Sequence, residues 1–299
     1  MTDIRAAVVA LHDRFTHEGL DRRTFMAELT RIAGGAAAAS VALSSVACRA
    51  AEPVVAERDA RIRTQPLEWE VAPDRVYRGY NAAPADAAPG LPVVFVIHEN
   101  RGLNDHIRDV TRRLAVAGYS AVAPDFLSLA GGTPADEDRA REMIGQLDMA
   151  QTVTDGAAMV RYLASPESGA RKVGAIGFCW GGGLVNRLAV AAGRSLSAAV
   201  PFYGPAPDPA EAVRVEAPML IILAGRDERV NRTALPWAEA LRAAGKDARA
   251  ITYPDVDHAF HNDTSEMRYD REAAQQAWAA TLEFLGRHLR TPAAGAPEA

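Results

Sequence analysis

The sequence predicts an α/β fold: a doubly wound, mainly parallel sheet in a single domain. Two observations carry this prediction. Short β-branched runs such as Val93–Ile97 are typical of strands that are buried on both faces of a sheet. Segments with apolar residues at helical spacing, such as Asn104–Ala117, alternate with these runs along the chain. Because strand and helix alternate, parallel strands joined by right-handed crossovers are the expected arrangement.

The individual elements follow from the same patterns and from their boundary residues. An edge strand is expected at 76–80, and further strands at 93–97, 119–123, 172–176, 197–202, 218–223 and 248–253. Helices are expected at 104–117, in two stretches of 136–164, and at 184–192, 234–244 and 271–289. Asn104 is a good N-cap for the first of these helices, and Gly118 ends it.

Composition narrows the function. The 299 residues are 48% apolar, which is enough for one large domain. A net charge of -5 and a pI of about 5.8 argue against nucleic acid or an anionic membrane surface as a partner. The chain has no Gly-x-Gly-x-x-Gly after a strand and no phosphate-binding loop motif, so we expect no nucleotide cofactor. Small-molecule chemistry fits these properties best.

Residues 1–51 resemble a twin-arginine export leader. The pair Arg22-Arg23 precedes an uncharged, Ala-rich run, and small residues at 47–51 follow it. This order predicts export to the periplasm by the twin-arginine export machinery; the alternative is an Ala-rich helix on a cytoplasmic enzyme. The run between Arg31 and Arg49 is shorter than the roughly 20 apolar residues of a spanning helix, so no stable membrane span is expected.

The rest of the chain divides simply. Residues 52–65 are expected to form a linker, residues 66–290 the folded domain, and residues 291–299 a flexible tail. The two cysteines, Cys48 and Cys179, lie in the leader and the domain, so a disulfide framework is not expected. Lipidation of Cys48 is disfavoured because Ser45 stands where lipoprotein signals usually carry an aliphatic residue.

The strongest chemical signal is the segment Gly177–Gly183, which reads Gly-Phe-Cys-Trp-Gly-Gly-Gly between a predicted strand and a predicted helix. This is a nucleophile elbow with cysteine in place of serine. Side chains at Gly177 or Gly181 would clash with neighbouring backbone in such a turn. The adjoining helix N-terminus favours the thiolate form of Cys179. The alternative is a buried structural cysteine beside a glycine-rich turn.

Two further residues complete a catalytic constellation. Asp227 follows one predicted strand and His258 follows the next, and this order of nucleophile, acid and histidine is that of the α/β-hydrolase fold. His258 would accept the Cys179 proton and return it to the leaving group, while Asp227 would orient the imidazole. The alternatives for the acid are Asp255, Asp257 and, more remotely, Asp125, which is more typical of a strand-ending turn.

Residues 66–290 resemble the dienelactone hydrolase family, the carboxymethylenebutenolidases. The motifs that carry the resemblance are 96–103 (VIHENRGL), 123–125 (APD), 177–182 (GFCWGG) and 258–260 (HAF). The segments 98–102 (HENRG) and 261–264 (HNDT), together with the leader, are most similar to an exported branch of that family. The resemblance implies a hydrolase that cleaves a small ester or lactone through a cysteine nucleophile, without a metal or a cofactor.

The resemblance also implies roles that spacing alone does not show. A glutamate at the position of Glu99 pairs with the resting thiol, and a neighbouring carboxylate keeps a thiol neutral and less easily oxidised. The backbone N–H groups of Trp180 and Asn100 would form the oxyanion hole. The side chains of Trp180 and Tyr203 are candidates either for the wall of the substrate pocket or for simple packing.

At two pocket positions the sequence departs from the family pattern. Well-known members bind the substrate carboxylate with two arginines, at places where this chain has Leu129 and Asn262. Loss of two such donors weakens the binding of an anionic group. We therefore expect a less acidic ester or lactone as substrate.

Three other functions compete with this interpretation. The loop residues Asp255, Asp257, His258, His261 and Asp263 offer oxygen and nitrogen donors for a metal, although their spacing follows no known metal-binding motif. A non-catalytic binding protein could reuse the fold. An acyltransferase or a peptidase could use the same three catalytic residues.

Overall fold

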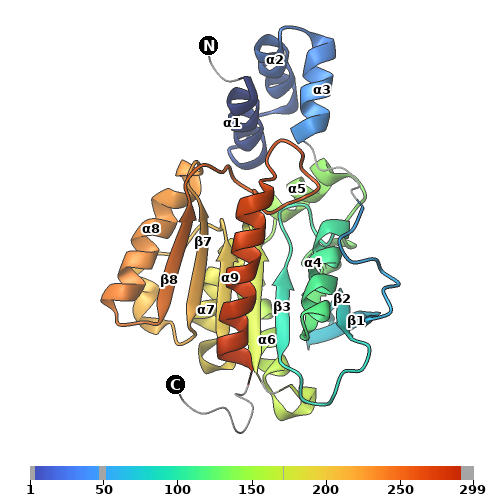
Figure 1. Cartoon of the computed structure of the whole chain (residues 1–299), viewed down its shortest axis with the longest axis vertical. Helices are drawn as coiled ribbons and strands as arrows, with labels where there is room; N and C mark the ends of the chain where they lie inside the picture. Colours follow the sequence, from blue (N-terminus) through green and yellow to red (C-terminus); the bar gives the residue numbers. More distant parts are fainter. Residues whose placement is uncertain (1–3, 47–51, 171, 291–299) are drawn as a thin grey trace.

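The core of the protein is one eight-stranded sheet (Figure 1). The computed structural model describes residues 4–46, 52–170 and 172–290. The strand order is β1-β2-β4-β3-β5-β6-β7-β8. The pairs β1–β2 and β2–β4 are antiparallel, and all the other pairs are parallel. The strands are β1 (Ile62–Ala72), β2 (Arg75–Pro84), β3 (Val93–Ile97), β4 (Ser120–Pro124), β5 (Val173–Phe178), β6 (Ala198–Phe202), β7 (Met219–Ala224) and β8 (Ala248–Tyr253).

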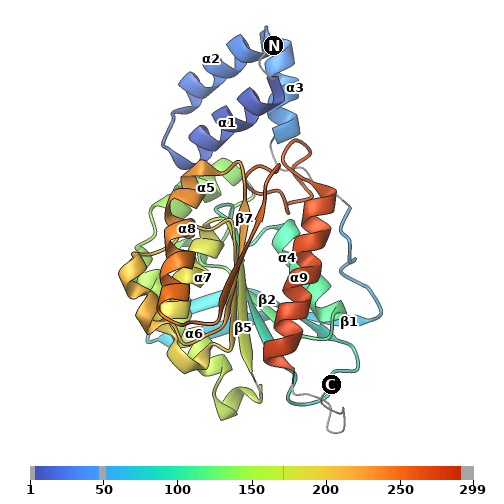
Figure 2. The ribbon, with the colours of Figure 1, turned by 60° about the vertical axis from the view of Figure 1, so that its left-hand side comes forward.

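Helices cover both faces of this sheet, as Figure 2 shows with the sheet turned nearly edge-on. The α-helices of the sheet domain are α4 (Asp105–Val116), α5 (Glu137–Gly145), α6 (Met149–Leu163), α7 (Trp180–Ala191), α8 (Glu228–Ala243) and α9 (Arg271–Leu289). Helices α4 and α9 pack into one apolar core, and α6, α7 and α8 pack into the other. The predicted doubly wound, mainly parallel α/β fold is therefore confirmed.

The pleat of β3 divides its side chains between the two cores. Val94 and Val96 belong to the core under α4 and α9, whereas Val93, Phe95 and Ile97 belong to the opposite core. All five residues are buried, which explains why the strand is a continuous β-branched and aromatic run with no polar alternation.

The predicted start of the sheet is wrong in two details. The strand expected at the edge, 76–80, lies within β2, which is paired on both sides, with β1 and with β4. The true outer strand is β1, which begins at Ile62 inside the segment expected to be a linker. Its burial pattern mixes exposed, half-buried and buried residues, because an outer strand has a neighbouring strand on one side only. The charged stretch 57–63, which includes the first two residues of β1, made this segment resemble a linker.

Three helices at the N-terminus form a small unit of their own, the N-terminal helical unit: α1 (Ile4–His17), α2 (Arg22–Ala33) and α3 (Ala36–Val46). Asp21 caps α2 by accepting a hydrogen bond from the Thr24 N–H, and Gly34 ends it with a φ of 79°. Phe15 and Phe25 stack with ring centroids 4.4 Å apart, and Leu29 is fully buried beside them. The unit thus has its own apolar centre.

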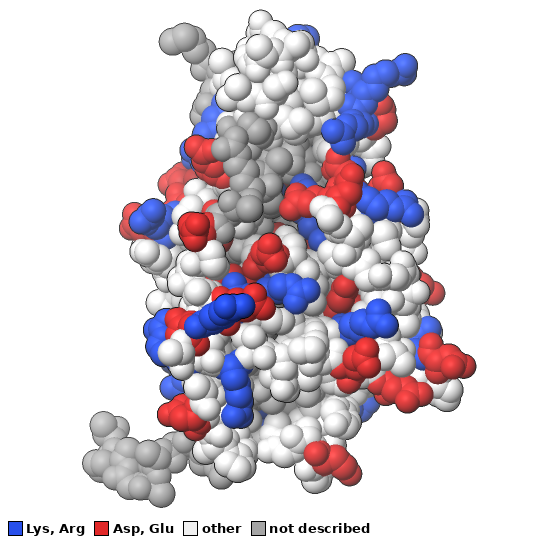
Figure 3. Space-filling view, turned by 90° about the vertical axis from the view of Figure 1, so that its right-hand side faces the viewer, with Lys and Arg blue, Asp and Glu red and all other residues white. Residues whose placement is uncertain are grey.

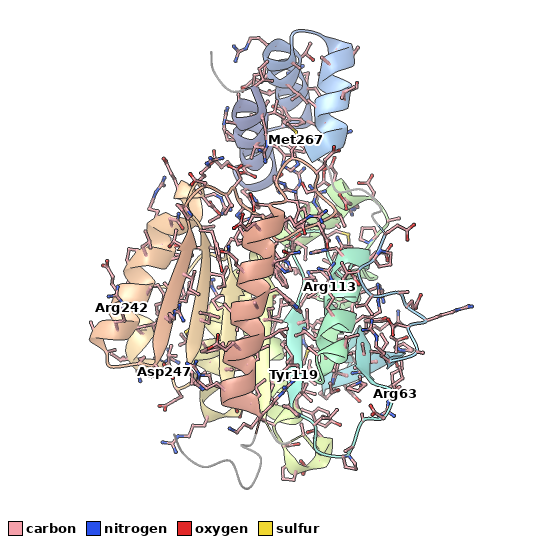
Figure 4. The ribbon with its side chains drawn as sticks, viewed as in Figure 1. Arg63, Arg113, Tyr119, Arg242, Asp247 and Met267 are labelled. Atoms are coloured by element: carbon pink, nitrogen blue, oxygen red, sulfur yellow. The ribbon has the colours of Figure 1, made fainter. Side chains whose placement is uncertain are left out.

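The N-terminal helical unit sits on one end of the sheet domain, above the loop that leads into α9 (Figure 4). Arg5 donates hydrogen bonds to the backbone oxygen of Met267, at 2.7 and 3.1 Å. Arg141 of α5 donates to the Phe15 backbone oxygen and lies over the Phe15 ring. Arg22 forms an ion pair of 2.5 Å with Asp138. These contacts are mostly polar and made by side chains.

Charges of both signs are interspersed on the face that Figure 3 shows, in keeping with the modest net charge. Within the described ranges, none of the helices combines the length and the apolar character needed to cross a membrane. The predicted cleavage region 47–51, including Cys48, and the predicted tail 291–299 lie outside the described residues.

Candidate active site

Cys179 occupies a strained turn between β5 and α7. Its φ is 56° and its ψ is -114°, a conformation that a side chain rarely adopts. The surrounding glycines make the turn possible. A Cβ on Gly177 would lie 2.4 Å from the Gly181 oxygen, and one on Gly181 would lie 2.4 Å from the His98 oxygen. The predicted clash at both glycines is therefore confirmed, and the strain on Cys179 is held by the backbone around it.

Asp227 and His258 meet in the geometry of an acid–histidine pair. His258 Nδ1 lies 2.5 Å from the Oδ2 of Asp227, and both side chains are buried. Asp227 is also the N-cap of α8, where its Oδ1 accepts a hydrogen bond from the Val230 N–H. The carboxylate is thus fixed by the helix start while its second oxygen faces the imidazole. Because Nδ1 is bound to Asp227, Nε2 is the nitrogen available toward Cys179.

The charges around His258 favour the protonated form of its imidazole. Burial alone would lower the pKa of His258, but the charge of Asp227 and the nearby Cys179 sulfur oppose it and raise the pKa to about 10. Burial would raise the pKa of Asp227, yet the charge of His258 and the hydrogen bond to it hold that pKa below its usual value. The Cys179 sulfur and a ring nitrogen of His258 lie within 4.8 Å of each other. The imidazole therefore lies close to the Cys179 sulfur.

The other carboxylates proposed for the acid lie elsewhere. The Asp255 side chain is 88% exposed and approaches Arg226, as does Asp257. Asp125 accepts hydrogen bonds from the backbone of Leu127 and from Thr133, so it stabilises the turn after β4. Asp227 is the carboxylate hydrogen-bonded to His258.

The loop residues considered as a rival metal site do not converge. His261 points into an aromatic cluster, with its ring 5.2 Å from that of Phe178 at an interplanar angle of 26°. Burial lowers the pKa of His261 to about 3. Asp263 binds His106 and Arg113 instead. Among the residues that the structure describes, these loop side chains form no common donor cluster.

Glu99 belongs to a second buried polar group close to the site. Its Oε2 accepts a hydrogen bond of 2.7 Å from the Asn262 amide, and its Oε1 lies 3.5 Å from the Tyr203 hydroxyl. Tyr203 has a φ of 35°, and its ring lies 5.1 Å from that of His258. Burial, together with the charges of Glu99 and Cys179, raises the pKa of Tyr203 well above its usual value. Asn262 thus contacts the carboxylate that the family resemblance predicts to pair with the resting thiol.

The two predicted oxyanion donors lie at element ends. Trp180 is the first residue of α7, and N–H groups of a first helical turn have no partner within the helix. Asn100 follows β3 and is buried. The Trp180 ring stacks on His98, 5.3 Å away at 11°. His98 in turn donates from Nδ1 to the Glu99 backbone oxygen and accepts at Nε2 from the Phe126 N–H, which fixes the loop containing Glu99 and Asn100.

Leu129, the third predicted pocket residue, is on the surface. It lies in the short 3-10 turn Ser128–Ala130 beside β2 and is 45% exposed. The structure therefore brings together Glu99, Tyr203 and Asn262, but leaves Leu129 outside this buried group.

His17, at the end of α1, is the residue near the site that sequence reasoning missed. Its ring lies 4.8 Å from that of His258, edge to face. A ring nitrogen of His17, one of His258 and the Cys179 sulfur all lie within 4.8 Å of one another. No local motif identified this histidine, because its place depends on how the N-terminal helical unit packs. Cys179 is only 5% exposed beneath it.

Comparisons with known proteins agree with this architecture. Residues 77–289 match the dienelactone hydrolase family. Two relatives carry the name "putative carboxymethylenebutenolidase". The one from Methylorubrum extorquens is 31% identical over 72% of this chain and 78% of its own length. The one from Yersinia pestis is 33% identical over 70% of this chain and 83% of its own length.

Solved structures give the same result. The crystal structure titled "putative dienelactone hydrolase" from Klebsiella pneumoniae has a TM-score of 0.66 and 29% identity, and covers 75% of this chain and 99% of its own. A thermostable esterase from Pseudomonas putida, at 15% identity, shares the fold with a TM-score of 0.61 and covers 96% of this chain and 97% of its own. The chain belongs to the dienelactone hydrolase family of carboxylic ester hydrolases, with the α/β-hydrolase fold.

Proposed function

We propose that this hydrolase cleaves a small ester or lactone through an acyl-enzyme on Cys179. The observation that carries the proposal is the buried His258–Asp227 pair, whose second imidazole nitrogen is available beside a cysteine on a strained elbow. An acid, a base and a nucleophile in this relation are what acyl transfer requires.

In the first half-reaction, the Cys179 sulfur attacks the ester carbonyl while His258 holds the thiol proton. The backbone N–H groups of Trp180 and Asn100 stabilise the negative charge on the carbonyl oxygen. His258 then gives its proton to the leaving oxygen, and the C–O bond breaks. In the second half-reaction, His258 takes a proton from the water that attacks the thioester, the C–S bond breaks as the acid forms, and His258 returns the proton to the Cys179 sulfur.

Glu99 is proposed to restrain the resting thiol. Its burial and its hydrogen bond to Asn262 support a fixed carboxylate near the reaction centre. A neighbouring negative charge disfavours the thiolate until substrate displaces it. Replacement of Glu99 by Gln should increase the rate at which peroxide inactivates the enzyme; an unchanged rate would show that Glu99 has only a structural role.

The substrate is proposed to be less acidic than a dienelactone. Leu129 is apolar and exposed, and the Asn262 amide is engaged with Glu99, so neither position provides a cation for a substrate carboxylate. Faster turnover of dienelactone than of a matched neutral ester would contradict this proposal.

A panel of neutral esters and lactones, with dienelactone for comparison, tests the chemistry. Cys179→Ala should abolish hydrolysis, whereas Cys48→Ala should retain it, and mass spectrometry should detect an acyl group on Cys179 of the wild type. Unchanged hydrolysis by Cys179→Ala would refute the nucleophile. Absence of turnover and of any acyl adduct would favour a binding protein, and transfer of the acyl group to an added alcohol or amine would favour an acyltransferase.

We further propose that residues 1–51 act as a twin-arginine leader and that the enzyme is exported to the periplasm. The order of arginine pair, Ala-rich run and small residues supports this proposal, and the Arg22 side chain is 69% exposed and thus accessible to an export receptor. Joint replacement of Arg22 and Arg23 by Lys should retain the enzyme in the cytoplasm of a bacterial host. Equal distribution of both forms between the compartments would favour the cytoplasmic alternative.

A further inference from the structure

We propose that His17, Cys179 and His258 form a zinc site, at which the N-terminal helical unit closes over the nucleophile. One donor atom from each residue lies within 4.8 Å of the other two. The three side chains come from α1, from the elbow before α7 and from the loop after β8. The site therefore exists only in the chain that still carries residues 4–46, before any removal of the proposed leader, and only while the N-terminal helical unit is seated on the sheet domain.

The donor set is the one that zinc prefers. Imidazole nitrogen and thiolate sulfur are the usual protein ligands of Zn²⁺, and one cysteine with two histidines leaves a fourth position for water. Tetrahedral coordination places neighbouring ligand atoms roughly 3.5 Å apart. The three donor atoms lie within 4.8 Å of one another, so they would draw together to bind one ion.

Two nitrogens in the cluster lack a hydrogen-bond partner in the described part of the chain, and only that of His258 has a role in the proposed reaction. The Nε2 atoms of His17 and His258 are both buried, and neither has a hydrogen-bond partner. A buried polar atom without a partner is unfavourable. A metal ion bound between them would satisfy both nitrogens at once.

The surroundings also fit a metal ligand. His258 presents its Nδ1 to Asp227 at 2.5 Å, which is the carboxylate–histidine arrangement that commonly supports a metal-bound imidazole. This contact fixes the direction of Nε2 toward the cluster. The carboxylate that serves the hydrolytic reaction would therefore also support the zinc ligand.

Zinc in this position would inhibit hydrolysis reversibly. It would occupy the Cys179 sulfur and His258 Nε2, which the acyl transfer needs, and would tie His17 to the domain. Cys179 and His258 share one proton, so coordination of both releases that proton to solvent and involves no redox change. Binding can be measured without any substrate, so this proposal does not depend on the proposed ester hydrolysis.

The test uses the full chain, first freed of metal with a chelator. We expect the wild type to bind one Zn²⁺ with release of a proton, and Co²⁺ to give the absorption of a thiolate-to-cobalt charge transfer. His17→Gln should weaken zinc binding by at least about 100-fold, more than the loss of an outer-sphere partner. His12→Gln is the matched control, because His12 is also a buried histidine of α1 but is not part of the cluster.

Three results would overturn the proposal. They are absence of stoichiometric zinc binding by the wild type, absence of the thiolate band with Co²⁺, and equal zinc affinity of His17→Gln and the wild type. Circular dichroism and thermal melting of both histidine variants exclude an effect of misfolding. If zinc inhibits the wild type and His17→Gln equally, the ion binds only the Cys179–His258 pair, and the N-terminal helical unit plays no part.

Discussion

The elbow around Cys179 and the N-terminal helical unit above it are held in different ways. At the elbow, the backbones of three strands and of the start of α7 are in direct contact. A Cβ atom on either Gly177 or Gly181 would therefore clash with backbone atoms. The N-terminal helical unit is joined to the domain mainly by arginine side chains that bond backbone oxygens or carboxylates. The reactive geometry is therefore rigid, whereas its cover is attached by contacts that can break separately.

This difference has a functional meaning. Cys179, Asp227 and His258 are all buried and His17 of α1 lies beside His258, so movement or removal of the N-terminal helical unit would expose them. A small cavity of about 310 Å³, lined in part by Phe15, Phe25 and Arg101, lies at the junction of the two regions. Local opening of a weakly attached element requires less free energy than opening of the core. Access can thus change without any change in the catalytic geometry.

The largest effect is expected from Gly181→Ala. The added Cβ would lie 2.4 Å from the backbone oxygens of Ile97 and His98, neither of which can move without breaking β3 from the elbow. We expect destabilisation of about 3 kcal/mol or more, or no soluble protein, in urea unfolding. Gly145→Ala is the control, since nothing lies within 4 Å of its Cβ in α5, and it should be stabilised by about 0.5–1 kcal/mol. Equal stability of the two variants would show that the elbow is adaptable.

The next effect concerns Asp227→Asn, which leaves the packing intact and removes the charge beside His258. Steady-state kinetics should show kcat lower by roughly 10²- to 10⁴-fold. Asp255→Asn, whose side chain is 88% exposed, should retain activity. A loss of activity in Asp255→Asn alone would transfer the role of the acid to that residue.

The same substitution has a pH signature. The pKa of His258 is about 10 in the folded state, above its ordinary 6.5, so the stabilisation from this pair is fully present below pH 6.5 and is lost as pH rises toward 10. The difference in free energy of unfolding between wild type and Asp227→Asn should therefore shrink over that interval. A constant difference would contradict the ion pair.

The smallest effect on the sheet domain is expected from a substitution in the N-terminal helical unit. Leu29→Ala empties the centre of the N-terminal helical unit, at a cost of about 2–5 kcal/mol that falls on this unit alone. In a Cys48→Ser background, a thiol reagent should modify Cys179 about tenfold faster or more, with little change in the main melting transition. The control is Ile4→Ala, whose side chain is 60% exposed. Equal labelling rates would mean that the two regions open together.

The features that the sequence predicted best depend on residues close together in the chain. The elbow could be read from Gly177, Cys179 and Gly181 because a tight turn requires those residue types at that spacing. The sheet could be read from its buried β-branched runs. Strand β1 escaped because an outer strand with charged residues does not show that pattern.

Contacts between distant segments could not be read from the sequence. Asn262 was expected to line the substrate pocket, and its hydrogen bond to Glu99 depends on how the loop after β8 folds against the end of β3. His17 approaches His258 only because α1 packs over that loop. Such contacts depend on tertiary packing, and no periodicity or turn signal encodes them.

The buried imidazole of His261 has a consequence for acid tolerance. Its pKa is lowered to about 3, so the folded protein excludes a proton that the unfolded chain binds below pH 6.5. Its contribution to stability is therefore present above pH 6.5 and is lost as pH falls toward 3, the reverse of His258. Only near pH 6.5 are both contributions complete, so two buried rings of opposite charge preference, three residues apart, define one interval in which the enzyme is most robust.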